Sequence, residues 1–345
     1  MNAKAAAVDT NAAPPRRRFA IPDWVFTFSA WVALVLVTLA AVAFSPRRNG
    51  EIVFLGGNNL LNIVRAVSET GILAIGMTFV ILVGGIDLSV GAILGLAAVD
   101  VAVLMTVNGL GVAPAIGLIL VIGLLFGLLQ GVVSARLGVQ AFVVTLAGMQ
   151  VARGLARIWS GGQGVPLAYG SSGPGTAPEA FALLNSRAFG GTVPIPALIF
   201  VAVAVIAVLI MRYSVFAGHV YAVGGNPRAA RLSGIAVTRI KVAVYGIAGL
   251  LAALAGIIHA GQLNQGSPND GTGYELDAIA AVVIGGTSLM GGVGSMAGTL
   301  AGALLLGVLN NILALNNVDS NIQLLVKGVI IVAAASVQTL RSRSS

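Results

Sequence analysis

The chain has 345 residues, of which 57% are apolar and only 9% are charged. Soluble domains carry about 25% charged residues, so this composition and the mean hydropathy of +0.98 exclude a soluble globular enzyme. The net charge of +8 does not indicate a nucleic-acid partner, because the basic residues are spread along an apolar chain with few aromatic residues. The absence of cysteine excludes disulfides and thiolate metal ligands. What remains is a polytopic membrane protein with an all-α fold and no predicted catalytic or metal-binding residue.

The apolar residues form ten segments that are predicted to be transmembrane helices, since about 20 apolar residues cross the hydrocarbon core. These segments are 24–44, 71–86, 90–107, 112–133, 139–157, 194–212, 242–260, 278–293, 295–314 and 322–338. Segments 71–86 and 278–293 are short and run directly into glycine pairs, which predicts short or broken helices at glycine-rich turns. The predicted transmembrane domain is therefore 24–340, between tails at 1–23 and 341–345.

The basic residues indicate the orientation, because Lys and Arg in short loops stay on the cytoplasmic side. With the amino terminus inside, twelve of the 19 basic residues fall in cytoplasmic loops and six fall outside. Both termini and the tails 1–23 and 341–345 are therefore predicted to be cytoplasmic. The loop 158–193, rich in Gly, Pro and Ser, is then external. The loop 213–241, which contains no acidic residue, is then cytoplasmic.

A carboxylate and a hydroxyl follow the first glycine pair, in the sequence Gly84-Gly85-Ile86-Asp87-Leu88-Ser89. Non-helical backbone at membrane depth is tolerated where it is buried in protein or faces a watery cavity. Asp87 and Ser89 suit a tight interhelical turn that caps the next helix. Contact of Asp87 with a transported ligand is the alternative.

The cytoplasmic loop contains the signals of a short helix. Asn226 and Pro227 are typical of an N-cap and a first helical residue, and Gly234 is a stop signal. The residues between them are Arg228, Ala229, Ala230, Arg231, Leu232 and Ser233. Such a helix, with Arg228 and Arg231 on one face and Ala229 and Leu232 on another, can bind a partner protein. It can equally lie on anionic lipid, which the same arginines favour.

A third glycine-rich run begins with Gly285, Gly286 and Thr287 and continues to Ser295. Small residues let helix backbones approach closely, so this run is first a packing and bending device. We also expect it to lie at a helix break near the transport pathway.

Polar side chains inside spans are costly and are functional hypotheses by default. Asp100 and Lys327 can pair with each other, line a pathway or respond to a proton, and Lys327 can instead reach the interface. Five amides also lie in or near spans: Gln130, Gln140, Gln150, Asn310 and Asn311. Amides both donate and accept hydrogen bonds, so they suit a neutral polyhydroxylated solute, with interhelical hydrogen bonds as the alternative. Gln150 and Asn310 are the amides that we assign to the pathway.

The three glycine-containing motifs carry a family resemblance. The runs GGIDLSVGA at 84–92, AVGGNPRAARLSGI at 222–235 and GGTSLMGGVGSMAGT at 285–299 resemble the membrane permeases of ABC importers for monosaccharides. This group includes ribose, xylose, arabinose and galactose permeases, with branched-chain amino-acid permeases as more distant relatives. The resemblance covers about residues 24–340.

The resemblance implies several partners and a location. Family members pair two permease subunits, identical or paralogous, with cytoplasmic ATPase subunits and a periplasmic sugar-binding protein, in the bacterial inner membrane. The segment at 222–235 matches the coupling segment that docks into the ATPase. The chain has no G-x-x-x-x-G-K-[ST] motif, so ATP and Mg²⁺ are expected on the ATPase, and no cofactor on this chain. The resemblance does not fix the sugar.

The main alternative is a secondary transporter for a small polar solute, driven by protons or sodium, with Asp87 or Asp100 as the ion site. Secondary carriers also use broken helices at the membrane midplane, so the glycine breaks do not discriminate between the two. A membrane-embedded enzyme is a more distant alternative.

Overall fold

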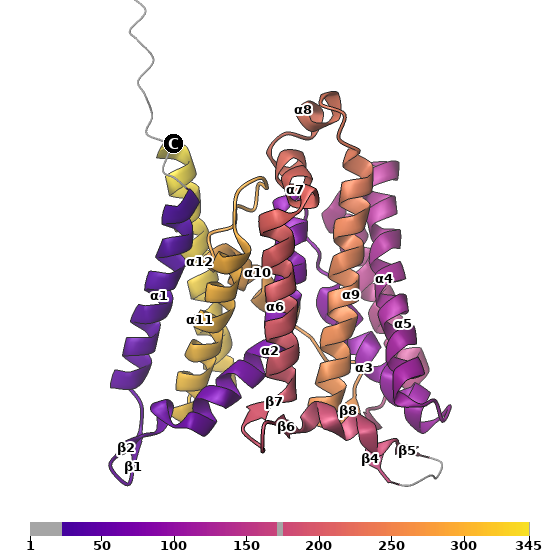
Figure 1. Cartoon of the computed structure of the whole chain (residues 1–345), viewed down its shortest axis with the longest axis vertical. Coiled ribbons are helices and arrows are strands. Elements are labelled where there is room, and N and C mark those ends of the chain that lie inside the picture. The colour runs from indigo at the N-terminus through magenta and orange to yellow at the C-terminus, as the bar shows by residue number, and fades with distance from the viewer. Residues whose placement is uncertain (1–22, 171–174, 345) are drawn as a thin grey trace, which may run out of the picture.

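The computed structural model describes residues 23–170 and 175–344, and this part of the chain is a bundle of helices (Figure 1). The α-helices are α1 (Asp23–Ala43), α2 (Gly57–Leu82), α3 (Val90–Thr106), α4 (Val112–Leu137), α5 (Ala141–Ser160), α6 (Ile195–Tyr213), α7 (Val215–Gly225), α8 (Pro227–Leu232), α9 (Val237–Leu263), α10 (Tyr274–Ile284), α11 (Met296–Leu315) and α12 (Ser320–Ser344). Two 3₁₀ helices, η1 (Val53–Leu55) and η2 (Glu179–Asn185), lie in the connections. The predicted all-α fold is confirmed.

Six of the described helices are long and apolar enough to cross a membrane, namely α2, α4, α5, α6, α9 and α11. The protein is therefore a polytopic membrane protein, as predicted. The helices α1, α3 and α12 begin within two residues of predicted spans, and α10 is short, with 11 residues. The number of ten spans stays a prediction.

The predicted beginning of the second span at residue 71 is wrong, because α2 begins at Gly57 and has 26 residues. The polar residues of its first half belong to the helix because they have partners inside the protein. The Nε of Arg65 donates to Gln262 at 3.0 Å, and Glu69 is paired with His259 of α9. A search for runs of apolar residues cannot detect that these polar side chains are paired with distant residues.

The helix α9 lies at the centre of the bundle and packs on α2, α3 and α4. Its contact with α4 depends on glycines four residues apart, Gly123, Gly127 and Gly131. A Cβ at Gly127 would lie 2.9 Å from the carbonyl carbon of Tyr245 and nearer still to its oxygen. Close approach of helix backbones through small residues is a common way for membrane helices to pack.

The two ends of the bundle differ (Figure 1). At one end, α8 extends beyond the other helices, and the beginning of α1 and the end of α12 lie on the same side. At the opposite end lie four short strand pairs: β1 (Arg47–Arg48) with β2 (Glu51–Ile52), β3 (Val165–Pro166) with β8 (Gln265–Gly266), β4 (Ala168–Tyr169) with β5 (Thr176–Ala177), and β6 (Arg187–Ala188) with β7 (Val193–Pro194). We call these the α8 end and the strand end.

The predicted tails fall differently in the structure. Residues 1–22 of the predicted tail 1–23 lie outside the described residues. The predicted tail 341–345 begins inside α12, which continues to Ser344.

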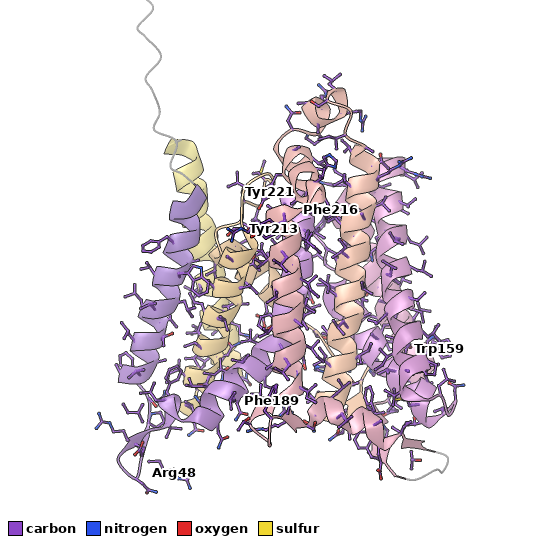
Figure 2. The ribbon with its side chains drawn as sticks, in the orientation of Figure 1. Arg48, Trp159, Phe189, Tyr213, Phe216 and Tyr221 are labelled. Carbon is purple, nitrogen blue, oxygen red and sulfur yellow. The ribbon has the colours of Figure 1, made fainter. Side chains whose placement is uncertain are left out.

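Aromatic residues that are exposed or half-buried lie near both ends of the bundle. Figure 2 shows Trp159 and Phe189 toward the strand end, and Tyr213 and Tyr221 toward the α8 end. Trp159 and Tyr213 are 58% and 71% exposed. Amphipathic aromatic rings collect at the two membrane–water interfaces, so these residues fit a membrane that lies between the α8 end and the strand end.

Candidate functional site

The short helix predicted between Asn226 and Gly234 is present as α8, and local interactions define its ends. The Asn226 side chain accepts hydrogen bonds from the amides of Arg228 and Ala229, both at 3.0 Å. Gly234 has a φ of +85°, the left-handed conformation that ends a helix and suits glycine. The predicted N-cap and stop signal are confirmed.

The side chains of α8 form an exposed surface. Arg228, Ala229 and Arg231 are exposed, and Leu232 is 91% exposed. Only Ala230 of this helix is buried. Asn226, Pro227, Ser233 and Gly234 are exposed around it. An almost fully exposed leucine beside two arginines combines an apolar contact with positive charge, which suits a protein partner.

The backbone leading into α8 contacts both predicted helix breaks, at a place that we call the glycine junction (residues 82–85, 224–225 and 290–292). The Gly292 amide donates to the Leu82 carbonyl at 2.9 Å. A Cβ at Gly224 would lie 2.5 Å from the Gly292 nitrogen and nearer still to the Leu82 oxygen. Gly84 and Gly291 have φ of +75° and +87°, and a Cβ at Gly291 would lie 2.8 Å from the Gly84 nitrogen. The three segments meet without side chains between them.

The second break separates α10 from α11 and is as closely packed. A Cβ at Gly285 would lie 2.5 Å from the carbonyl group of Gly298 on α11. Gly286 has a φ of +88°, and the Thr287 side chain is fully buried. Residues 285–287 thus bend the chain and let α10 approach α11.

The first break contains a buried hydrogen-bond network. The Asp87 Oδ1 accepts hydrogen bonds from the Ser89 amide at 2.9 Å and from the Ser89 hydroxyl at 2.6 Å. The Gln130 amide of α4 donates to the Ser89 hydroxyl at 2.9 Å. Ser89 occupies the N-cap position of α3, but its side chain makes no capping bond. The turn is present, and Asp87 caps the free amide of Ser89 at the beginning of α3. The Ser89 hydroxyl makes no cap of its own, because it is engaged by Asp87 and Gln130.

Asp100 and Lys327 do not pair with each other. Lys327 of α12 donates to Asp277 of α10, with 3.0 Å between Nζ and Oδ2. Asp100 of α3 instead lines small cavities with Ile119 and Ile122 of α4. Asp277 was not identified from the sequence as a partner of Lys327, because Asp277 immediately precedes the predicted span 278–293 and so falls in a predicted loop.

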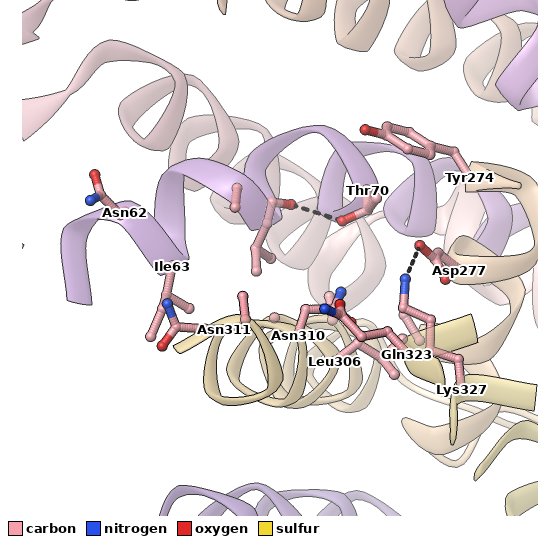
Figure 3. A pocket seen from close by; sticks show the side chains of 16 residues that line it. Asn62, Ile63, Thr70, Tyr274, Asp277, Leu306, Asn310, Asn311, Gln323 and Lys327 are labelled. Carbon is pink, nitrogen blue, oxygen red and sulfur yellow. Dashed lines mark hydrogen bonds and ion pairs between the residues drawn. The ribbon is translucent and has the colours of Figure 1, made fainter. Parts of the chain in front are cut away.

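A polar pocket of about 490 Å³ lies among α2, α10, α11 and α12 (Figure 3). It is lined by Asn62, Ile63, Ala66, Val67, Thr70, Tyr274, Asp277, Ala281, Ala303, Leu306, Gly307, Asn310, Asn311, Ala314, Gln323 and Lys327. Asn310 thus lines a cavity, and its place in the transport pathway stays a prediction. Gln150 is exposed on α5 and is not among the lining residues.

Sequence reasoning missed a buried ionic cluster near the strand end. The Nδ1 of His259 lies 2.7 Å from Oε2 of Glu69, and its Nε2 lies 3.5 Å from Oδ2 of Asp270. Arg153 of α5 donates to the carbonyls of Pro268 and Asp270. These contacts fix the connection from α9 to α10, so they position the helix that carries Asp277. Ionisable residues in apolar stretches are the signal that marks such clusters.

The comparisons with known proteins agree with the three motifs. The family model described as a branched-chain amino acid transport system permease component matches residues 59–335. The chain is 40% identical to the ribose import permease protein RbsC of Escherichia coli K12 over 322 residues, which cover 93% of this chain and 96% of the relative. It is 44% identical to RbsC of Bacillus subtilis 168 over 289 residues, covering 84% and 87%.

The xylose transport system permease protein XylH of E. coli K12 is 35% identical to the chain over 343 residues, covering 85% and 87%. No solved structure matches the chain. The resemblance to monosaccharide permeases is thereby confirmed, and these relatives are named as transport components and not as enzymes. The chain therefore belongs to the family of transport-system permease components.

Proposed function

We propose that the chain is the membrane-spanning subunit of an ATP-driven bacterial importer for a neutral monosaccharide, a pentose or a hexose. The similarity to ribose and xylose permeases supports the sugar as solute. The observation that carries the coupling to ATP is the exposed helix α8, whose preceding residues contact both helix breaks at the glycine junction. D-ribose is the first sugar to test.

In the proposed orientation the chain is a multi-pass protein of the bacterial inner membrane, and its α8 end lies in the cytoplasm. The exposed Arg136, Arg228, Arg231 and Arg239 belong to elements that end or begin at the α8 end, which supports this orientation. The strand end, with the segment 158–193, then faces the periplasm, where a sugar-binding protein docks. The transmembrane domain 24–340 pairs with a second copy or a paralogue.

Helix α8 is proposed as the docking site for an ATPase subunit, which binds ATP and Mg²⁺. The arginines provide charge complementarity, which sets partner choice and orientation, and Leu232 provides an apolar anchor. The alternative, that α8 lies on anionic lipid, is disfavoured by its place beyond the ends of the neighbouring helices (Figure 1).

The glycine junction is proposed to transmit movement of α8 to the transport pathway. ATP can drive a conformational change of the complex only if it binds more tightly to one conformation than to the other. Because Gly224, Gly292 and Leu82 are in direct backbone contact, a displacement of α8 moves both helix breaks without an intervening flexible side chain. The breaks at 84–89 and 285–295 are therefore the parts of the pathway that we expect to change.

Charge reversal on α8 tests the proposal. The complex of the chain with its ATPase and binding protein is reconstituted, and ATPase co-purification and D-ribose uptake are measured. We expect Arg228→Glu with Arg231→Glu to abolish both. The control is Arg47→Glu with Arg48→Glu, which makes the same charge change on exposed residues at the strand end and is expected to keep the ATPase bound.

Three outcomes contradict the proposal. Full assembly and uptake in the α8 variant would show that α8 is not the docking site, and loss of the ATPase only in the control would show the opposite orientation. Uptake by the chain alone that an uncoupler abolishes would instead support an ion-coupled secondary transporter.

A further inference from the structure

We propose that the pocket among α2, α10, α11 and α12 is a binding site for a neutral monosaccharide within a single permease chain, with Asp277 and Lys327 as its charged hydroxyl ligands. The inference rests on the proposed function and adds the place of the sugar and the side chains that bind it.

The position of the pocket suits a solute that arrives from the periplasm. It is formed by the first half of α2, the beginnings of α10 and α12, and the second half of α11. In Figure 1, α2 and α12 begin and α11 ends near the strand end, whereas α10 lies deeper in the bundle. The pocket therefore extends from the strand end into the bundle. The volume of about 490 Å³ lies within the range of roughly 300–1,000 Å³ that is typical of small-molecule sites.

The chemistry of the pocket fits hydroxyl groups. Figure 3 shows Asp277 and Lys327 on one side of the space, Asn62 and Asn311 on the other, and Asn310 and Gln323 between them. The carboxylate accepts hydrogen bonds, the ammonium donates them, and each amide does both. A hydroxyl also donates and accepts, so a sugar matches the chemistry of this lining.

The ion pair itself argues for a ligand. The side chains of Lys327 and Asp277 are only 17% and 20% exposed. Replacing a buried ion pair with apolar residues is often neutral or stabilising, so stability alone does not explain this pair in an apolar bundle. Because the two charges are 3.0 Å apart and compensate each other, the pocket is neutral and suits a neutral solute better than an ion.

An unused acceptor gives a second, independent indication. Within the described residues, no group donates to the buried Oδ1 of Asn310, although buried polar atoms are almost always hydrogen-bonded. Asn311 is held in place by reciprocal bonds with Asn59, at 2.9 and 3.0 Å. The pocket therefore combines a fixed wall with an acceptor that a sugar hydroxyl can satisfy.

The natural absence of cysteine in this chain makes a direct test possible, because a single introduced thiol is then the only site for a thiol reagent in the permease. Ala314→Cys places the thiol at the pocket wall on α11 without removing a proposed sugar ligand. Asn316→Cys is the matched control, since Asn316 is an exposed amide at the end of the same helix and does not line the pocket. The rate of modification by a small water-soluble reagent is measured on the full complex, with and without D-ribose.

We expect saturating D-ribose to slow the modification of Ala314→Cys about tenfold, as occupancy of about nine-tenths would give, and to leave Asn316→Cys unchanged. Adding Asp277→Leu and Lys327→Met together removes both charges and should abolish this protection. L-leucine, which has two charges of its own, should not protect.

The outcomes separate the inference from the proposed function, which the uptake by the wild-type complex tests. Uptake of D-ribose without protection at Ala314→Cys would overturn the site and keep the function. Protection without uptake would support the site and refute the function. Protection by L-leucine alone would overturn the sugar class. Protection of Gln150→Cys in place of Ala314→Cys would overturn the place.

Discussion

A single methyl group at the glycine junction should separate folding of the bundle from transport. In Gly224→Ala, the new Cβ would lie 2.5 Å from the Gly292 nitrogen and closer still to the Leu82 oxygen. Both are backbone atoms, so neither can move aside by changing a rotamer. The segments must separate, and the hydrogen bond from Gly292 to Leu82, now 2.9 Å, is lost.

The size of the effect follows from these two terms. Overpacking costs about 1–3 kcal/mol and the lost hydrogen bond about 1 kcal/mol, so the expected destabilisation is about 2–4 kcal/mol. The three atoms that the new Cβ would meet first all belong to Leu82 and Gly292, so the damage is expected at the junction. We therefore expect the variant to assemble but to transport slowly, since the residues that lead into α8 no longer contact the breaks in the native way.

The assay compares Gly224→Ala with Gly225→Ala in the same complex. Gly225 is the next residue, and a Cβ there would meet no atom within 4 Å, so its variant should behave as wild type. Thermal unfolding in detergent, ATPase co-purification and D-ribose uptake are measured for both. Equal uptake and equal unfolding temperature for the two variants would refute the reasoning from close backbone contact.

Two further variants test the packing of the bundle. Gly127→Val should prevent α9 from packing on α4 and leave little monodisperse protein on size-exclusion chromatography, whereas Gly117→Val, where a Cβ meets nothing within 4 Å, should not. Glu69→Ala removes the partner of the His259 Nδ1, so it should lower the unfolding free energy by about 1–3 kcal/mol, measured by thermal unfolding. Glu69→Gln keeps an acceptor and should lose less; an equal loss in both would show that the hydrogen bond is not what stabilises the cluster.

Local sequence signals predicted the features whose causes are local. The helix α8 depends on the Asn226 side chain, the adjacent proline and the left-handed Gly234, all within nine residues. The long apolar helices depend on the composition of about 20 consecutive residues, which is also a local property of the sequence. In these helices the residues that determine the structure are neighbours in the sequence. The helices and most of their ends could therefore be predicted.

Long-range partners decided the features that the sequence did not predict. The beginning of α2 was missed because Glu69 is compensated by His259, 190 residues away. Lys327 was given Asp100 as a candidate partner, whereas the fold brings it to Asp277, 50 residues away. Three-dimensional packing chooses among carboxylates that are equivalent in sequence. Residue type and position therefore singled out Asn310 and Asn311 of this pocket, but neither its other two amides, Asn62 and Gln323, nor its ion pair.

The short helix α10 connects the two functional regions. Asp277 lies in its first turn and faces the pocket, while Gly285 directly follows its last residue and begins the second break. These positions are eight residues apart, about 12 Å along a helix at 1.5 Å per residue. A helix this short moves as a rigid unit, so a displacement of the second break at the glycine junction reaches Asp277 directly. Lys327 is carried by a different helix, α12, and movement of α10 therefore changes the distance across the ion pair. In the proposed mechanism, binding of a sugar in the pocket and movement of α8 act on the same helix from its opposite ends, which gives a physical basis for coupling the two.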